Sequence, residues 1–288
     1  MKHIVGFSGG IDSQACARWV LNRFPKEDVI LMNSDAGGNE HPLTVEFVQW
    51  YSNNIHPVVR VSAIVGDIWK TVGFAENRRG LDSNAPLDFP TMAALKGRFP
   101  ARQAQFCTQV LKLNPQKRWM LSEFGPGGQY EGIEYARYSG VRADESKERA
   151  AKTKADRWDD FYDCQFLCPL FDWTKKMCFD YVDVHGEKIN HLYRLGFSRV
   201  GCSPCVNAKK EDIATWADRF PEMIDKVRDW ETSTGLSFFA PVVPTMKGTG
   251  VYNFIDDVVA WSRTARGGTK ELMPILREAC ESKYGLCE

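Results

Sequence analysis

The segment Ser8-Gly9-Gly10-Ile11-Asp12-Ser13 follows directly on the apolar run 3–7 and is the feature that most constrains this chain. An apolar run, a pair of glycines and a periodic stretch predict a strand, a sharp turn and a helix over about 13–23. Adjacent glycines let the backbone turn tightly and bring N–H groups close to a ligand. The helix directs the positive end of its dipole at the same point. The segment therefore predicts an anion cradle, best suited to pyrophosphate.

The polar residues of this loop give it further chemistry. Asp12 is placed to hold Mg²⁺ against the phosphates, and the hydroxyls of Ser8 and Ser13 can donate hydrogen bonds. No Gly-Lys-Ser/Thr follows the glycines and the chain has no G-x-G-x-x-G, so a Walker loop and a dinucleotide fingerprint are excluded. The loop residues that we expect to contact a bound nucleotide are Ser8, Gly9, Gly10, Ile11, Asp12 and Ser13.

Composition narrows the class of partner and the compartment. The 288 residues include 37 basic and 37 acidic side chains, so no global field attracts nucleic acid and such binding would need a local basic patch. No signal peptide is evident and no apolar run approaches about 18 residues, so we expect a cytoplasmic protein without a membrane span. In that compartment the nine cysteines are expected to be core residues, metal ligands or reactive thiols rather than disulfides.

The first part of the chain alternates predicted strands and helices. A strand over 29–32 precedes the loop 33–38, a helix over 43–54 follows, and a third strand covers 57–61. This order predicts an α/β fold, a Rossmann-like doubly wound parallel sheet with helices on both faces. Ligands of such sheets bind at the carboxyl ends of the strands, where the loops 8–13 and 34–40 should converge.

The later part is expected to be less regular and then mostly helical. Residues 62–106 predict a functional loop or lid, and a strand is expected over 130–138. Predicted helices cover 108–124, 174–184, 187–195, 209–219, 221–233, 253–262 and 270–283. These patterns predict two parts, a nucleotide-binding α/β domain over 1–198 and a region over 199–288 that consists of a cysteine-rich loop and helices.

The spacing of the cysteines indicates a metal or cluster site. Cys202 and Cys205 form a C-x-x-C turn, and Cys107 lies at the start of a predicted helix, which stabilises a thiolate. With Cys287 near the end of the chain they would make a four-thiolate site for Zn²⁺ or a [4Fe–4S] cluster, with Cys280 as a competitor for the fourth place. The cysteines with apolar or aromatic neighbours, which we expect in the core, are Cys16, Cys164, Cys168 and Cys178.

A second anion contact is predicted at Arg142, in Ser139-Gly140-Val141-Arg142. It follows a strand and should reach the same sheet edge as the glycine loop, where a guanidinium binds phosphate or sulfate oxygens. The alternative is an ordinary surface ion pair with Asp144 or Glu145. Arg149 and Lys112 are further candidate anion contacts, whereas Arg118 is expected to be solvated.

Several separated motifs resemble the phosphoadenylyl-sulfate (PAPS) reductase family of the adenine nucleotide alpha-hydrolase superfamily, the PP-loop ATP pyrophosphatases. The resemblance covers nearly the whole chain and is nearest to the DNA phosphorothioation and thiolation members. The segments that carry it are 7–13, Phe106-Cys107-Thr108 with Leu111-Lys112, 140–146, 169–173, Asn190 with Leu192-Tyr193, and 196–205.

The resemblance implies a sheet that holds an adenine nucleotide, with Asp35 and Glu40 near the nucleoside. One branch of the family reduces adenylyl sulfate or PAPS to sulfite. The other activates a target with ATP for insertion of sulfur. The chain departs from the reductase branch twice: Phe106 stands where a Cys-Cys pair would need a cysteine, and Gly285-Leu286 precedes Cys287 with no histidine after it.

We therefore expect the second branch, in which ATP is cleaved to AMP and pyrophosphate to activate a target, with nucleic acid as the expected target class. The residues expected to take part in catalysis are Asp12, Lys112 and Arg142. A sulfur donor or a modification-complex partner is implied. Two alternatives remain: a PAPS or adenylyl-sulfate reductase, and a non-catalytic nucleotide-binding scaffold with a structural zinc.

Overall fold

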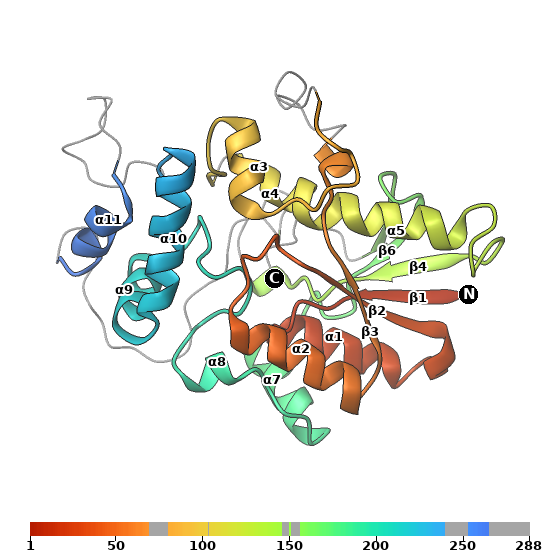
Figure 1. Ribbon diagram of the computed structural model, residues 1–288. Helices are drawn as coiled ribbons and strands as arrows, with labels where there is room; N and C mark the ends of the chain where they lie inside the picture. The colour runs from red at the N-terminus through yellow and green to blue at the C-terminus, as the bar shows by residue number, and fades with distance from the viewer. Residues whose placement is uncertain (69–79, 103, 146–149, 151–155, 240–252, 265–288) are drawn as a thin grey trace.

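The computed structural model describes residues 1–68, 80–102, 104–145, 150, 156–239 and 253–264 of the 288-residue chain. Its centre is a six-stranded sheet with the order β3-β2-β1-β4-β6-β5 (Figure 1). Neighbouring strands run parallel except β5, which is antiparallel to β6. The strands are β1 (Lys2–Gly6), β2 (Val29–Ser34), β3 (Val58–Val61), β4 (Tyr135–Tyr138), β5 (Asp156–Asp159) and β6 (Cys164–Leu167). The predicted doubly wound α/β fold is confirmed.

Successive residues of the central strands face two different cores because side chains alternate along a strand. Val5 of β1 belongs to a cluster with α1 (Ile11–Leu21), α2 (Pro42–Asn54) and α7 (Lys175–Val184). Ile4 belongs to a cluster on the opposite face with α5 (Asn114–Phe124). In Figure 1, α1, α2 and α7 lie on one side of the sheet and α5 lies on the other. Burial on both faces explains the continuous apolar runs of these strands.

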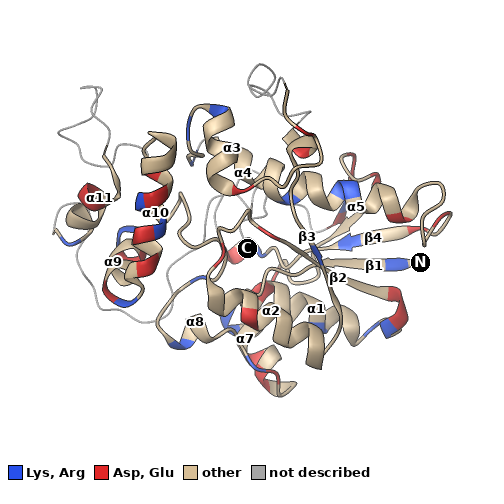
Figure 2. Ribbon diagram, in the orientation of Figure 1, with Lys and Arg blue, Asp and Glu red and all other residues tan. Residues whose placement is uncertain are grey.

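A third cluster joins two stretches that are distant in sequence. It contains Phe89 of α3 (Phe89–Lys96) and Phe106 of α4 (Phe106–Thr108). It also contains residues of the C-terminal helices α9 (Lys210–Arg219), α10 (Pro221–Thr234) and α11 (Ile255–Ser262). Acidic and basic residues are interspersed along α9 and α10, as Figure 2 shows. The helices after residue 208 therefore share apolar packing with residues 63–111.

The boundaries of several predicted elements shift for local reasons. The helix predicted over 187–195 is only α8 (His191–Arg194), because Asn190 accepts from the Leu192 N–H and Gly196 has a φ of 90°. The helix predicted over 108–124 contains a π turn at Gln109–Leu113 before Pro115, which lacks an N–H. The short 3₁₀ turns are Lys26–Asp28, Val65–Ile68 and Ala143–Glu145. The helix expected over 270–283 lies outside the described residues.

The helices of the described chain are also short for a lipid bilayer. None of them combines the length and the apolar character that crossing a membrane requires.

Candidate active site

The glycine loop after β1 is held in shape by its own two serines. Ser13 Oγ donates to the carbonyl of Gly10 at 2.9 Å, and it accepts from the Ser8 N–H at 3.2 Å and from Ser8 Oγ at 3.1 Å. The Gly10 N–H donates to Ser8 Oγ at 3.3 Å. Gly9 has a φ of 81°, which favours glycine. The hydroxyls predicted to bind an anion therefore also fix the loop.

Helix α8 supports this loop from one side. The Tyr193 hydroxyl accepts from the Ile11 N–H at 2.9 Å, and Asn190 Nδ2 donates to the Gly9 carbonyl at 3.4 Å. Helix α1 begins at Ile11, two residues earlier than predicted, and Gly10 precedes it without a side-chain cap. Asn190 and Tyr193 were part of the sequence resemblance, but no pattern in the sequence gave their partners.

Gly140 brings the end of β4 against the same loop. A Cβ at this position would lie 2.4 Å from the Asp12 carbonyl oxygen and 3.0 Å from the Ser13 nitrogen. Only glycine permits this approach without a shift of the backbone. The loops after β1 and β4 therefore meet at the point where the strand order reverses, which is where doubly wound sheets bind ligands.

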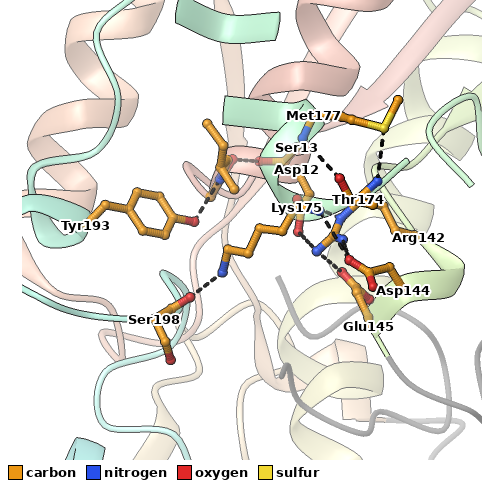
Figure 3. A network of polar contacts seen from close by, with 12 residues as sticks. Asp12, Ser13, Arg142, Asp144, Glu145, Thr174, Lys175, Met177, Tyr193 and Ser198 are labelled. Carbon is orange, nitrogen blue, oxygen red and sulfur yellow. Dashed lines mark hydrogen bonds and ion pairs between the residues drawn. The ribbon is translucent and has the colours of Figure 1, made fainter. Parts of the chain in front are cut away.

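Asp12 and Arg142 form a buried ion pair at this junction (Figure 3). Arg142 Nε and Nη2 donate to the two carboxylate oxygens of Asp12 at 2.9 and 3.2 Å, and each side chain is 3% exposed. Arg142 Nη1 also donates to Asp144 at 3.0 Å. Arg142 thus does pair with Asp144, as the alternative interpretation expected, but the guanidinium is buried and its bidentate partner is Asp12, so this is not an ordinary surface ion pair. Contact of Asp12 with Mg²⁺, and of Arg142 with an anion, stays a prediction.

The ion pair is connected to the next helix and to the loop before the cysteines. Asp144 accepts from the Lys175 N–H in the first turn of α7 at 3.2 Å. Lys175 Nζ donates to the Ser198 carbonyl, and Figure 3 shows this lysine extending past the loop toward that residue. The glycine loop is consequently tied to the segment that leads into the C-x-x-C turn.

A cavity that opens to solvent lies at this sheet edge. It contains both loop serines, and Lys112 is the one lysine or arginine among its lining residues in the described chain. The lining residues are Gly6, Phe7, Ser8, Ser13, Met32, Asn33, Ser34, Ala36, Glu40, Lys112, Leu113, Gln116, Ser139, Gly140, Val141, Gly201 and Cys202. The structure thus brings the glycine loop, the predicted cation Lys112 and one predicted thiol to a single cavity.

The wall of the cavity formed by the loop after β2 carries a carboxylate. Glu40 Oε2 accepts from Arg60 Nη2 at 2.9 Å, and Asp35 Oδ2 lies 3.4 Å from the same nitrogen. Burial raises the pKa of Glu40 above its usual range, although Arg60 opposes the shift. Asp35, predicted to contact the nucleotide, is therefore engaged with Arg60 beside the cavity.

The C-x-x-C turn is fastened to the loop after β2 through backbone groups. Glu40 and Cys202 form an antiparallel bridge, and the Ser203 N–H donates to the Asn39 carbonyl at 3.1 Å. Asn39 Nδ2 donates to the Pro204 carbonyl at 3.0 Å. These bonds hold Cys202 at the edge of the large cavity.

A second, smaller cavity adjoins the first and is lined by Cys107, Cys202 and Cys205 together with Lys112 and Arg199. Three predicted thiols therefore face one space. Across the described ranges, however, no group of three or more His, Cys, Asp or Glu side chains is arranged to hold a metal ion. Cys287, its competitor Cys280 and the predicted anion contact Arg149 lie outside the described residues.

The remaining residues singled out from the sequence have structural positions. Cys16, Cys164, Cys168 and Cys178 are all buried, which confirms them as core thiols. Arg118 is 45% exposed and forms an ion pair with Asp67 at 3.0 Å, so the expectation of a solvated side chain was correct only in part.

Comparison with known proteins gives the family. The protein family described as "Phosphoadenosine phosphosulfate reductase domain" matches this chain over residues 82–208. An uncharacterized 37.8 kDa protein in the gpa 5′ region of Escherichia phage 186 is 30% identical over 339 positions, which cover 99% of this chain and 96% of that protein. An adenosine 5′-phosphosulfate reductase of Geobacillus thermodenitrificans is 31% identical over 102 residues, 35% of this chain and 43% of the reductase.

Among solved structures, the phosphate complex of a PAPS reductase from Candida auris aligns with a TM-score of 0.45 at 13% identity. The alignment covers 70% of this chain and 81% of that one. On the sequence matches, the chain belongs to the PAPS reductase family of the PP-loop superfamily. Its class is that of the adenine-nucleotide-binding enzymes of this family.

Proposed function

We propose that this chain cleaves ATP to AMP and pyrophosphate in order to activate an acceptor, with nucleic acid as the acceptor class, for sulfur transfer. The observation that carries the proposal is the cavity that contains Ser8, Ser13, Lys112 and Cys202 together. A phosphate-binding loop, a cation and a thiol in one space are the parts that such a reaction needs.

In this proposal an acceptor oxygen attacks the α-phosphorus of ATP, and the bond between that phosphorus and the β-phosphate oxygen breaks. Pyrophosphate leaves into the loop 8–13, where the serines and the start of α1 stabilise its charge. Lys112 binds the phosphates as a point charge. A sulfur nucleophile then displaces AMP from the activated acceptor.

Asp12 and Arg142 are proposed to act as a pair in this site. Both oxygens of Asp12 already accept from Arg142, so in this arrangement the carboxylate does not fit a direct Mg²⁺ ligand. The pair is therefore proposed to fix the first turn of α1 and the loop after β4. Any Mg²⁺ is proposed to arrive with the phosphates of ATP.

The cysteine thiols are proposed to take part in the second step of the reaction, the transfer of sulfur. Cys202 lines both cavities, whereas Cys107 and Cys205 line the smaller one. The [4Fe–4S] cluster or zinc expected from the sequence does not fit the described residues as they are arranged. The thiol proposed for the sulfur side of the site is therefore Cys202.

One observation favours a second candidate function, reduction of adenylyl sulfate. The reductase relatives match this chain, and a thiol lines the proposed nucleotide cavity. In that case Cys202 would be the described thiol that lines the proposed nucleotide cavity.

The products of two incubations, one with ATP and one with adenylyl sulfate, separate these functions. With ATP, Mg²⁺, a nucleic acid and sulfide, the proposal expects equal amounts of AMP and pyrophosphate. Sulfite formed from adenylyl sulfate and a dithiol, without pyrophosphate from ATP, would replace it with the reductase. Nucleotide binding with neither product would indicate the scaffold.

A further inference from the structure

The loop after β2 gives the proposed nucleotide cavity an acidic wall. Glu40 lines the cavity together with Ser34 and Ala36, while the loop serines lie where β1 ends. Ligands of doubly wound sheets extend along the carboxyl ends of neighbouring strands. A nucleotide whose phosphates occupy the glycine loop would therefore place its ribose along this wall.

The guanidinium beside this wall is already engaged. Arg60 Nη2 lies 2.9 Å from Glu40 Oε2 and 3.4 Å from Asp35 Oδ2, so two carboxylates share one cation. In dinucleotide-binding doubly wound sheets a carboxylate accepts from a ribose hydroxyl, and an arginine nearby accommodates a ribose phosphate; we apply the same chemistry to this wall. In this chain the Glu40 carboxylate lines the cavity, whereas Arg60 is not among the described lining residues.

Glu40 has little room to leave the wall. Its backbone forms the bridge with Cys202, and its side chain is only 10% exposed. Asp35 in turn accepts from the Gly38 N–H at 3.0 Å, which closes the loop between the two carboxylates. Lys112 and Lys226 also lie near enough to attract Glu40, but burial outweighs them and raises the pKa of this carboxyl group. A second anion placed here would meet a poorly solvated acidic group.

We infer that the cavity accepts adenine nucleotides whose two ribose hydroxyls are both unphosphorylated, and that Glu40 is the residue that excludes a 2′- or 3′-phosphate. The inference rests on the proposed function and sharpens it. ATP and adenylyl sulfate are substrates of the right class, and a nucleotide with a ribose phosphate, such as PAPS, is not. The ribose hydroxyls donate to the carboxylate, whereas a phosphate is repelled by it.

Calorimetric titration of the full chain with three nucleotides tests this inference. The probes are AMP, adenosine 3′,5′-bisphosphate and adenosine 2′,5′-bisphosphate. The expected result is that AMP binds at least about tenfold more tightly than either bisphosphate, because like charges in a partly desolvated site are costly. In Glu40→Gln, which removes the repelling charge and one of the two carboxylates that share Arg60, both bisphosphates should gain affinity relative to AMP. Asp180→Asn removes the same charge from an exposed pair on α7 and should leave the ratio unchanged.

Each result has a defined consequence. Tighter binding of a bisphosphate than of AMP to the unmodified chain overturns the inference while leaving adenine-nucleotide binding intact. An unchanged ratio in a folded Glu40→Gln variant overturns the role of Glu40. Binding of no adenine nucleotide overturns the proposed function and the inference with it. The ratio in the unmodified chain decides the substrate class even where the variant fails to fold.

Discussion

The two sides of the large cavity are built in different ways. On the phosphate side, side chains and backbone groups from β4, α8 and the loop itself converge on residues 8–13, and a buried ion pair lies behind them. On the thiol side, the turn 201–205 is fastened through backbone bonds to the loop after β2, and its cysteines line open cavities.

This difference separates a preorganised part from a part that is left accessible. A loop that must hold a leaving group benefits from a fixed geometry that needs no reorganisation during the reaction. A thiol that must react needs space and access, and Cys202 lines both cavities. Substitutions around the glycine loop test whether the phosphate side is as rigid as this contrast requires. Alkylation of Cys202 tests whether the thiol side is as accessible.

The largest effect is expected from Gly140→Ala. The new methyl group would lie 2.4 Å from the Asp12 carbonyl oxygen, so the loop or the end of β4 must move. Displacement of a binding group by about 1 Å can cost about 100-fold, and we expect a loss of nucleotide affinity of that order. Calorimetric titration with AMP measures it.

Gly186→Ala is the control for this substitution. Gly186 has a φ of 66° and no atom near its Cβ position, so the change adds backbone strain at a position that does not line the cavity. It should lower stability by about 1 kcal/mol and leave nucleotide affinity unchanged. Equal effects of the two variants on affinity would show that Gly140 has no special role in the loop.

Asp12→Asn should be the next largest change, in stability. It leaves the buried guanidinium of Arg142 without its bidentate partner, and removal of one member of a buried pair costs about 3 kcal/mol or more. Urea unfolding measures this loss against Asp180→Asn, which breaks an exposed pair and should cost less than about 1 kcal/mol. A similar small cost for both substitutions would mean that the pair does not hold the phosphate side together.

Much of the phosphate side could be predicted from the sequence, because its signals are local. The order of strand, paired glycines and helix fixed the position of the loop, and alternating strands and helices gave the parallel sheet. The pairing of Asp12 with Arg142 was not predicted, because the two residues are 130 positions apart and each was interpreted alone as an anion or cation ligand. The contacts of Tyr193 and Gly140 depend on packing between elements, which no local pattern records.

The thiol side was predicted less completely. The spacing of Cys202 and Cys205 indicated a turn, and Cys107 was correctly grouped with them at one cavity. The four-thiolate site stays a prediction, because Cys287 lies outside the described residues, among which no metal-binding group is present. Spacing gives the identity of possible ligands, but the arrangement of their sulfur atoms depends on how α4, α8 and the loop after β2 pack.

A smaller effect is expected from Tyr193→Phe. It removes the acceptor of the Ile11 N–H, which should cost about 1 kcal/mol of stability and raise the KM for ATP with little change in kcat. Tyr135→Phe removes a comparable bond to the Tyr162 carbonyl away from the loop. It should match the stability loss without the change in KM, and an identical kinetic profile for both variants would contradict a role of α8 in shaping the loop.

The smallest effect concerns the pH dependence of stability at His41, which lies at the end of the loop to which the C-x-x-C turn is fastened. Burial lowers the pKa of His41, which precedes α2 and accepts from the Leu43 N–H, despite the attraction of Glu222 and Glu46. The folded chain then binds a proton less readily than the unfolded chain, so this contribution to stability is complete above about pH 6.5 and is lost as the pH falls.

His41→Asn keeps the helix cap and removes the titrating group. Between pH 7.5 and pH 5.5, the unmodified chain should therefore lose about 0.5–1 kcal/mol more stability than the variant. Urea unfolding at the two pH values measures the difference. Parallel loss of stability in both proteins would show that His41 does not titrate in this range.

We propose that the glycine loop and Cys202 belong to a single nucleotide site. Alkylation of the native full chain by iodoacetamide, followed by mass spectrometry of each cysteine peptide, tests it directly. ATP should slow the modification of Cys202 by at least about tenfold, while the buried Cys16 and Cys178 stay unmodified with or without nucleotide. Modification of Cys202 at the same rate with saturating ATP would show that the nucleotide does not occupy the cavity this thiol lines, and would contradict the claim.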